Sequence, residues 1–151
     1  MGDILKISDA AALALHTVTM LADGGKEKSL STKEIAAKLK ASEAHLSKVL
    51  QRLAKAGLVS SIRGPKGGFR LEKDAKDITL LDVYEAIDGR LSVTRCLFGE
   101  PVCGQRGCIL GNAMEEASGM IRARMAGTRL ADLAADRGRL SGSGSPKGEV
   151  S

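Results

Sequence analysis

Apolar side chains recur at helical spacing near the start of the chain, between polar connections. Over residues 8–23, Leu, Val and Met side chains cover much of the helix circumference, which predicts a largely buried first helix. Ser8 or Asp9 can cap its start, and the following glycine pair ends it. Asp9 is therefore first interpreted as a cap or helix-dipole partner. His16 lies among apolar neighbours, which is more typical of a core histidine than of a ligand.

Two further helices follow, joined by a tight connection. Ser31 and Glu34 form an S-x-x-E capping box at the start of the helix predicted over residues 31–39. The next helix begins at Ser42 and runs to about residue 56, with one apolar face formed by Leu46, Val49, Leu50 and Leu53. Its opposite face carries basic and amide side chains. This order is typical of a helix-turn-helix, although such a face is as often only a solvated surface.

Residues 58–71, L-V-S-S-I-R-G-P-K-G-G-F-R-L, predict two short strands around a glycine-rich tip. Arg63, Lys66 and Arg70 give this hairpin positive charge. Glycines let backbone amides approach phosphates, and Arg and Lys neutralise their charge. A helix-turn-helix followed at once by a basic hairpin indicates a winged helix.

The distribution of charge favours the same interpretation. The chain has 151 residues and a formal net charge of +5. Residues 1–73 carry 13 Lys and Arg against 7 Asp and Glu, whereas residues 74–151 carry 10 against 11. Positive charge concentrated in one half suggests an anionic partner, and nucleic acid is the commonest one. No signal peptide or membrane-length apolar run is evident, so we expect a cytoplasmic protein.

All three cysteines lie in the segment C-L-F-G-E-P-V-C-G-Q-R-G-C, at Cys96, Cys103 and Cys108. Its glycines and Pro101 predict a loop. Three thiols cannot all pair within one chain, but three thiolates on a loop can converge on a soft metal centre. The alternative is that the cysteines are small buried hydrophobic residues. The spacing is not that of a zinc finger.

The remaining sequence predicts helices over residues 79–88 and 109–126 and a short helix over residues 128–136. The second of these has a heptad-like apolar seam formed by Leu110, Met114, Ala117 and Ile121, which favours packing against a second chain over a core helix of a monomer. Composition predicts a disordered tail over residues 137–151.

The wing sequence, preceded by the helix-turn-helix and followed by the three-cysteine loop, resembles the winged-helix iron–sulfur regulators typified by IscR and NsrR over about residues 1–135. The resemblance implies a mainly α fold with a small β-wing, comprising a winged helix-turn-helix and a long C-terminal dimerisation helix. The expected domains are a DNA-binding domain (1–90), a cluster-binding loop (91–108), a dimerisation helix (109–136) and the tail. The expected function is that of a homodimeric transcription regulator, in the first place a repressor. An iron–sulfur cluster, 4Fe–4S or 2Fe–2S, would control its binding to a double-stranded DNA operator in response to nitric oxide, redox state or iron–sulfur status.

The resemblance also implies which residues contact DNA. The N-terminal part of the recognition helix would read bases, and the wing would lie at the minor groove. Arg63 is the expected minor-groove contact, because a narrow groove concentrates negative potential. The expected DNA-binding residues are Ser31, Thr32, Ser42, Ala44, His45, Ser47, Lys48, Gln51, Arg52, Arg63, Gly64, Pro65, Lys66, Gly67 and Gly68.

The cluster ligands implied by the resemblance are the three cysteines and a fourth group. Gly111 stands where IscR has its ligating histidine, whereas Asp9, in I-S-D-A-A, matches the aspartate that NsrR-type members supply from the partner chain. His16 is the next candidate. The spacing of the cysteines departs from the commoner family pattern, which leaves the cluster type open.

Two other functions fit the same sequence. One is a cluster-free thiol- or zinc-dependent regulator on the same scaffold, and the other is a small iron–sulfur redox protein whose basic half binds an acidic partner. The two histidines, His16 and His45, lie on predicted helices far in sequence from the cysteines. No nucleophile–base pair is evident, so an enzyme is not expected.

Overall fold

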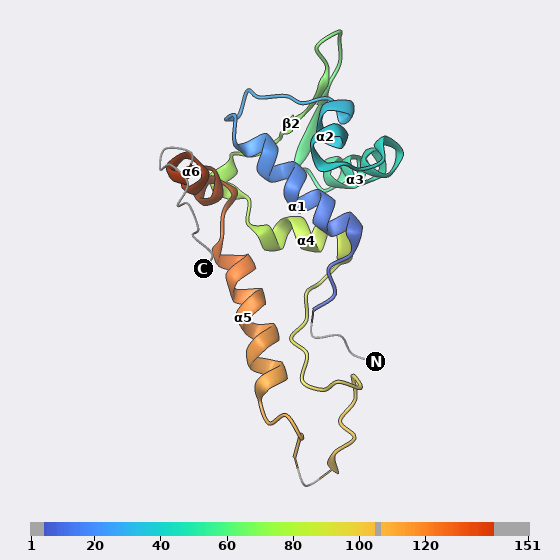
Figure 1. Ribbon diagram of the computed structural model, residues 1–151, viewed down its shortest axis with the longest axis vertical. Coiled ribbons are helices and arrows are strands. Elements are labelled where there is room, and N and C mark those ends of the chain that lie inside the picture. The colour runs from blue at the N-terminus through green and yellow to red at the C-terminus, as the bar shows by residue number, and fades with distance from the viewer. Residues whose placement is uncertain (1–4, 105–106, 141–151) are drawn as a thin grey trace, which may run out of the picture.

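The structure is a computed structural model that describes residues 5–104 and 107–140 (Figure 1). It is mainly helical with one antiparallel hairpin, which confirms the expected fold class. In chain order the elements are α1 (Asp9–Ala22), α2 (Thr32–Leu39), α3 (Glu43–Lys55), β1 (Val59–Ile62), β2 (Gly68–Leu71), the 3₁₀ turn η1 (Ala75–Asp77), α4 (Leu80–Asp88), α5 (Ala113–Gly127) and α6 (Leu130–Leu140).

Local capping explains where the helices begin. The Ser8 hydroxyl accepts a hydrogen bond from the Ala11 amide at 3.0 Å, and the Ser42 hydroxyl accepts one from the His45 amide at 3.3 Å. Ser31 and Glu34 form the expected capping box. Between α2 and α3, Lys40 adopts φ 52°, so the turn requires the left-handed conformation at a residue with a side chain.

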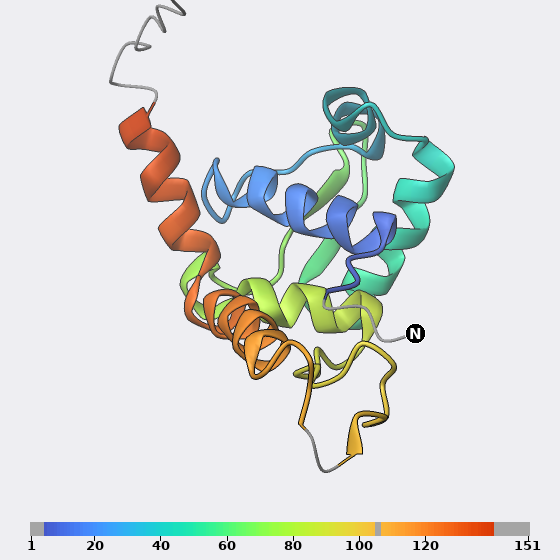
Figure 2. The ribbon, with the colours of Figure 1, turned by 60° about the horizontal axis from the view of Figure 1, so that its bottom comes forward.

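Helix α1 lies at the centre of the fold and packs against α3, α4 and α6 (Figures 1 and 2). Its small residues Ala11 and Ala14 are fully buried, which lets neighbouring helices approach closely. The other fully buried side chains are mainly aliphatic, among them Val18, Leu21, Ile35, Leu46, Leu50, Leu53, Ile78, Val83 and Leu130. The core therefore depends on aliphatic packing and contains few aromatic rings.

The hairpin is joined to the helix-turn-helix by a short third pairing. Strands β1 and β2 pair with Val59 opposite Leu71 and Ile62 opposite Gly68. Leu30 then pairs with Phe69: each residue's amide donates to the other's carbonyl, at 3.0 and 2.8 Å. Because Leu30 lies next to the cap of α2, the wing and the helix-turn-helix are connected directly.

After α4 the chain extends from the body as an arm, formed by the described residues 89–104 and 107–127, and then returns to the body at α6 (Figure 1). Residues 89–104 and 107–112 contain no long helix or strand, and α5 begins at Ala113 rather than at residue 109, because residues 109–112 form turns. A bridge between Thr79 and Arg129 then holds the start of α6 to the start of α4. Helix α6 extends to Leu140, so residues 137–140, assigned to the tail by composition, are helical. Residues 141–151 of the expected tail lie outside the described residues.

The apolar seam expected along the C-terminal helix differs in the structure. Met114 is almost fully buried within the chain, and Ile121 packs against the main core. Leu110 precedes the helix and is exposed. The reason is that the preceding loop covers one side of α5: the Thr94 amide donates to the Ser118 hydroxyl at 3.0 Å. A different side of α5, which carries Met120 at 69% exposure, remains open.

No helix in the described part of the chain combines the length and the apolarity that crossing a membrane requires.

The capping box of α4 generates a stability prediction. Thr79 Oγ1 accepts from the Asp82 amide at 3.1 Å, and the Asp82 carboxylate accepts from the Thr79 amide at 2.9 Å. Thr79→Ala should lower the free energy of unfolding by about 1 kcal/mol, measured by urea denaturation. Ser92→Ala, at an exposed loop position, is the control and should change it little. Equal effects of the two substitutions would contradict a capping role for Thr79.

Candidate nucleic-acid interface and thiol site

The outer face of α3 presents the side chains expected to read bases. Ala44, His45, Lys48 and Gln51 are exposed, and Ser47 is half-buried. The opposite face, formed by Leu46, Val49, Leu50 and Leu53, is buried in the core. The structure therefore orients these candidates toward solvent on one helix, with small residues in the first turn. This geometry suits insertion into a major groove.

The candidate residues at the helix starts already have structural roles. The Ser31 hydroxyl donates to Glu34 Oε2 at 2.8 Å and accepts from the Glu34 amide at 3.2 Å. Hydrogen bonds from the Ser31 backbone and side chain hold the pKa of the Glu34 carboxyl below its ordinary value. The stabilisation is therefore present above the unfolded-state pKa and is lost as the pH falls through the folded one. Ser42 caps α3, and Thr32 is half-buried in the first turn of α2.

Arg52 makes an intramolecular contact that the sequence did not reveal. Its guanidinium donates a hydrogen bond to the carbonyl of Ile87, in the last turn of α4. Arg52 lies in the last turn of α3, whereas the residues expected to read bases lie in the N-terminal part of that helix. Its expected contact with DNA therefore competes with a contact inside the protein. Its acceptor lies 35 residues further along the chain, so helical periodicity could not have indicated it.

The tip of the wing is accessible, and its glycines have different roles. Arg63, Gly64, Pro65 and Lys66 are exposed. A Cβ atom added at Gly67 would lie 2.4 Å from the Ile62 carbonyl oxygen, and one at Gly68 would lie 2.4 Å from the Leu30 carbonyl oxygen. These two glycines are therefore required by the fold of the wing itself.

The three cysteines line one cavity of about 180 Å³, together with Arg95, Pro101, Gly104 and Gly107. All three are free thiols; Cys96 is buried, whereas Cys103 and Cys108 are half-buried. The Cys96 thiol donates to the Glu100 carbonyl at 3.2 Å, and the Leu110 amide donates to Cys108 Sγ at 3.4 Å. The structure thus brings together the residues that the sequence grouped as one site.

The loop that carries these thiols is fixed on one side. Ser118 holds Thr94 by two hydrogen bonds, and Arg95 forms an ion pair with Glu115 at 3.2 Å. Within the described residues, no three His, Cys, Asp or Glu side chains are close enough to hold a metal ion as they stand. Three soft sulfurs that line one cavity are nevertheless a donor set of the type that binds soft metals and iron–sulfur clusters.

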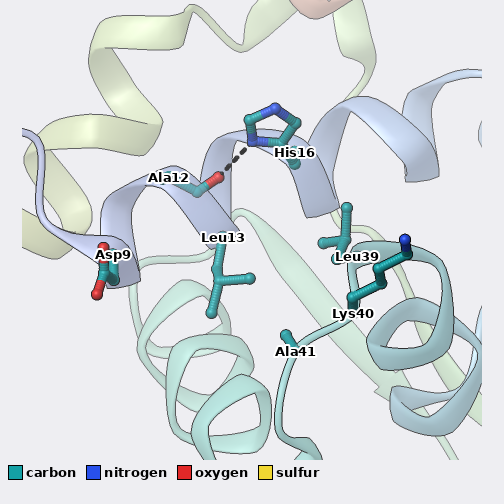
Figure 3. A pocket seen from close by; sticks show the side chains of 7 residues that line it. All are labelled: Asp9, Ala12, Leu13, His16, Leu39, Lys40 and Ala41. Atoms are coloured by element: carbon teal, nitrogen blue, oxygen red, sulfur yellow. Dashed lines mark hydrogen bonds between the residues drawn. The ribbon is translucent and has the colours of Figure 1, made fainter.

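Asp9 and His16 lie at a second cavity, which contains no cysteine. This cavity, of about 440 Å³, lies between α1 and the turn joining α2 to α3; it is lined by Asp9, Ala12, Leu13, His16, Leu39, Lys40 and Ala41 (Figure 3). His16 is exposed, and its Nδ1 bonds to the Ala12 carbonyl at 2.7 Å, so it is not a core histidine. Within one chain, neither candidate for the fourth ligand shares a cavity with the thiols.

Arg95 is a residue of the thiol cavity that the sequence reasoning missed. Its position in the chain, directly before Cys96, was the available signal.

Comparison with known proteins places this geometry in a family. The family model described as Rrf2, iron-dependent transcriptional regulator, matches residues 7–136. The chain belongs to the Rrf2 family. This family consists of transcriptional regulators that bind DNA and not of enzymes.

The Rrf2-family relatives include proteins with different names. An HTH-type transcriptional regulator of Bacillus subtilis (strain 168), YwgB, is 34% identical over 74% of this chain and 73% of its own. NsrR of Geobacillus kaustophilus is 31% identical over 90% of this chain and 94% of its own. Among solved structures, CymR, the global cysteine regulator of B. subtilis, has a TM-score of 0.73 at 30% identity and covers 87% of this chain and 98% of its own. IscR of T. potens has a TM-score of 0.71 at 25% identity, covering 93% and 94%.

The unequal burial of the three thiols predicts an order of alkylation. In cofactor-free, reduced protein, iodoacetamide should modify Cys103 and Cys108 several-fold faster than Cys96, because the Cys96 sulfur is shielded and bonded to Glu100. Peptide mass spectrometry after timed quenching measures the three rates. In guanidinium chloride the three rates should converge. Fastest modification of Cys96 in the folded protein would contradict the loop geometry.

Proposed function

We propose that this Rrf2-family protein is a homodimeric, operator-binding repressor whose affinity for DNA is set by occupancy of the three-thiol cavity. The single observation that carries this proposal is the convergence of Cys96, Cys103 and Cys108 on one cavity, at the end of an arm attached to a winged helix. A surface that reads DNA and a site that binds a cofactor are the two parts that a ligand-controlled regulator needs.

An iron–sulfur cluster, 4Fe–4S or 2Fe–2S, is the proposed occupant. Three cysteine sulfurs and no histidine line the cavity, which favours a thiolate-bound centre. The iron-dependent description of the family and the similarity to NsrR and IscR support this choice. Asp9 of a second chain is the proposed fourth ligand, with His16 as the next candidate. A cluster bound in this way supplies an iron site that is open to small molecules such as nitric oxide.

The proposed dimer rests on apolar surface that is left exposed around the arm. Ile109 is 84% exposed, and Leu110 and Met120 are also exposed. Phe98 and Val102, next to the thiols, are 62% exposed each. Large apolar side chains grouped in this way mark an interaction surface. A second chain packed there would cover them and bring its own Asp9 toward the thiols. Residues 91–108 and 109–136 would thus serve cluster binding and dimerisation, and residues 1–90 would bind DNA.

In the proposed complex with DNA, α3 enters the major groove and the wing lies at the adjacent minor groove. Ala44, His45, Ser47, Lys48 and Gln51 are the candidates for base and backbone contacts from α3. Arg63, with Gly64, Pro65 and Lys66, is the candidate at the minor groove. The exposure of all but Ser47, which is half-buried, supports these assignments.

A cluster-free, thiol-dependent regulator is the second candidate function. The structural similarity to CymR, named a global cysteine regulator, favours it. The accessible Cys103 and Cys108 would then respond to oxidants directly or bind zinc.

Arg63→Ala tests the winged-helix part of the proposal. Loss of one cationic contact should weaken operator binding and reduce the slope of log affinity against log salt by about one. Lys73→Ala, an exposed Lys after the hairpin, is the matched control and should leave the slope unchanged. Fluorescence anisotropy at several salt concentrations measures both.

A second measurement tests whether Arg63 lies in a narrow minor groove. If it does, replacing A·T by G·C pairs beneath the wing should weaken operator binding by the wild type more than operator binding by Arg63→Ala. Equal sensitivity would place Arg63 away from that groove.

Anaerobic purification tests the identity of the occupant. The expected protein is brown and contains iron and sulfide, and each of Cys96→Ser, Cys103→Ser and Cys108→Ser should reduce both contents. Asp9→Ala should retain iron but change the visible spectrum and its response to nitric oxide. A colourless protein containing zinc, or no metal, would support the thiol-dependent alternative. If neither iron nor sulfide is present and the triple serine variant binds the operator normally, control through this cavity is refuted.

A further inference from the structure

The C-terminal end of α4 connects three parts of the molecule through hydrogen bonds. We name residues 84–91 the α4 junction. On one side, the Asp88 carboxylate accepts from the Ser8 amide at 3.0 Å and from the Ser8 hydroxyl at 2.5 Å. One turn earlier on α4, the Tyr84 hydroxyl donates to the Lys6 carbonyl at 2.7 Å. The α4 junction therefore fixes the segment that begins α1 and carries Asp9.

The α4 junction also fixes the start of the loop that leads to the thiols. The Leu91 amide donates to Glu85 Oε1 at 3.2 Å, and the Leu91 carbonyl accepts from Arg122 Nε of α5 at 3.0 Å. Leu91 is itself buried. Cys96 follows five residues later, beyond the contacts of Thr94 and Arg95 with α5. The segment between the thiol loop and α4 is thus held at Leu91 by two hydrogen bonds, one to α4 and one to α5.

The third connection leads to the helix that is placed for DNA. Arg52, in the last turn of α3, donates to the Ile87 carbonyl inside the α4 junction. The last carbonyls of a helix lack partners within it and lie at its negative end, so a guanidinium is a favourable partner there. Because α3 is one continuous helix, a contact at Arg52 bears on the orientation of Gln51, directly before it, and of Lys48, about one turn earlier.

We propose that Arg52 is a positioning residue for DNA recognition. It couples the orientation of α3 to the α4 junction, and through that junction to the thiol loop and to the start of α1. The proposal rests on the proposed function in two ways: it takes Lys48 and Gln51 as contacts with DNA, and it takes the thiol loop as the site of control. Arg52 acts through the placement of Lys48 and Gln51, and not through a contact of its own with DNA.

The experiment uses the full chain and a duplex selected in vitro by the wild-type protein. Arg52→Gln removes the charge and the guanidinium, whereas Arg52→Lys keeps a cationic donor. Lys55→Gln is the matched control, because Lys55 is an exposed cation in the same last turn of α3. Anisotropy gives the affinity for the selected duplex and for an unrelated duplex at several salt concentrations. Thermal denaturation shows whether each variant is folded at the binding temperature.

Arg52→Gln should weaken binding to the selected duplex about tenfold, since a hydrogen bond to a charged group is lost. In Arg52→Gln, the affinity for the unrelated duplex and the slope of log affinity against log salt should change no more than they do in Lys55→Gln. Arg52→Lys should recover part of the affinity for the selected duplex. The loss of affinity in Arg52→Gln should not be confined to one base pair, and should affect discrimination at several base pairs of each half-site. A slope reduced by about one would identify a phosphate contact, and relaxed discrimination at one base pair would identify a base contact. Either result, or equality with Lys55→Gln, would overturn the proposal.

A double-mutant cycle tests the α4 junction without any cofactor. Glu85→Ala frees the Leu91 amide, and we expect its effect on operator affinity to be non-additive with that of Arg52→Gln. Additive effects would show that the junction does not couple the two contacts, and would overturn the coupling.

A second experiment compares the iron- and sulfide-reconstituted protein with the cofactor-free protein. The affinity of the wild type for the operator should differ between these two forms, and this difference should be smaller in Arg52→Gln. If the wild type shows no difference, the proposed control by a cluster fails while the cycle still decides the role of Arg52. A difference undiminished in Arg52→Gln would reject the link to the thiol loop.

Discussion

The packing of α1 against three other helices is the constraint on which the rest of the structure depends. Ala11, Ala14 and Val18 are completely buried, and no larger side chain fits between α1 and its neighbours without displacing them. The same helix begins beside Asp88 of α4 and contacts α3 and α6. The helix-turn-helix, α4 and the C-terminal helix are therefore all positioned by packing against this one helix. A movement at either end of α1 is resisted by the whole core.

Much of this architecture was predictable because its signals are local. The capping residues Ser31, Ser42 and Thr79 start helices where a side-chain oxygen can accept from an amide three residues ahead. The wing follows from alternation around a glycine-rich tip, and its register from the turn between the strands. The shared cavity of the cysteines was likewise indicated by their closeness in sequence.

Other features of the structure depend on tertiary contacts that local pattern does not indicate. His16 was interpreted as a core residue because its neighbours are apolar, yet that side of α1 faces an open cavity. The apolar seam on residues 109–126 was expected to face another chain, but the loop before α5 covers part of it. Arg52 looked like one more basic residue on a helix surface until its distant acceptor was known. None of these contacts leaves a trace in periodicity.

The pairing of Leu30 with Phe69 has a mechanical consequence. Two backbone hydrogen bonds tie Leu30, which directly precedes the cap of α2, to Phe69 in the second strand of the hairpin, and they resist separation of the wing from the helix-turn-helix. In the proposed complex with DNA, the wing and α2 would therefore dock as one unit. A bend in the operator would then displace the contacts of both together.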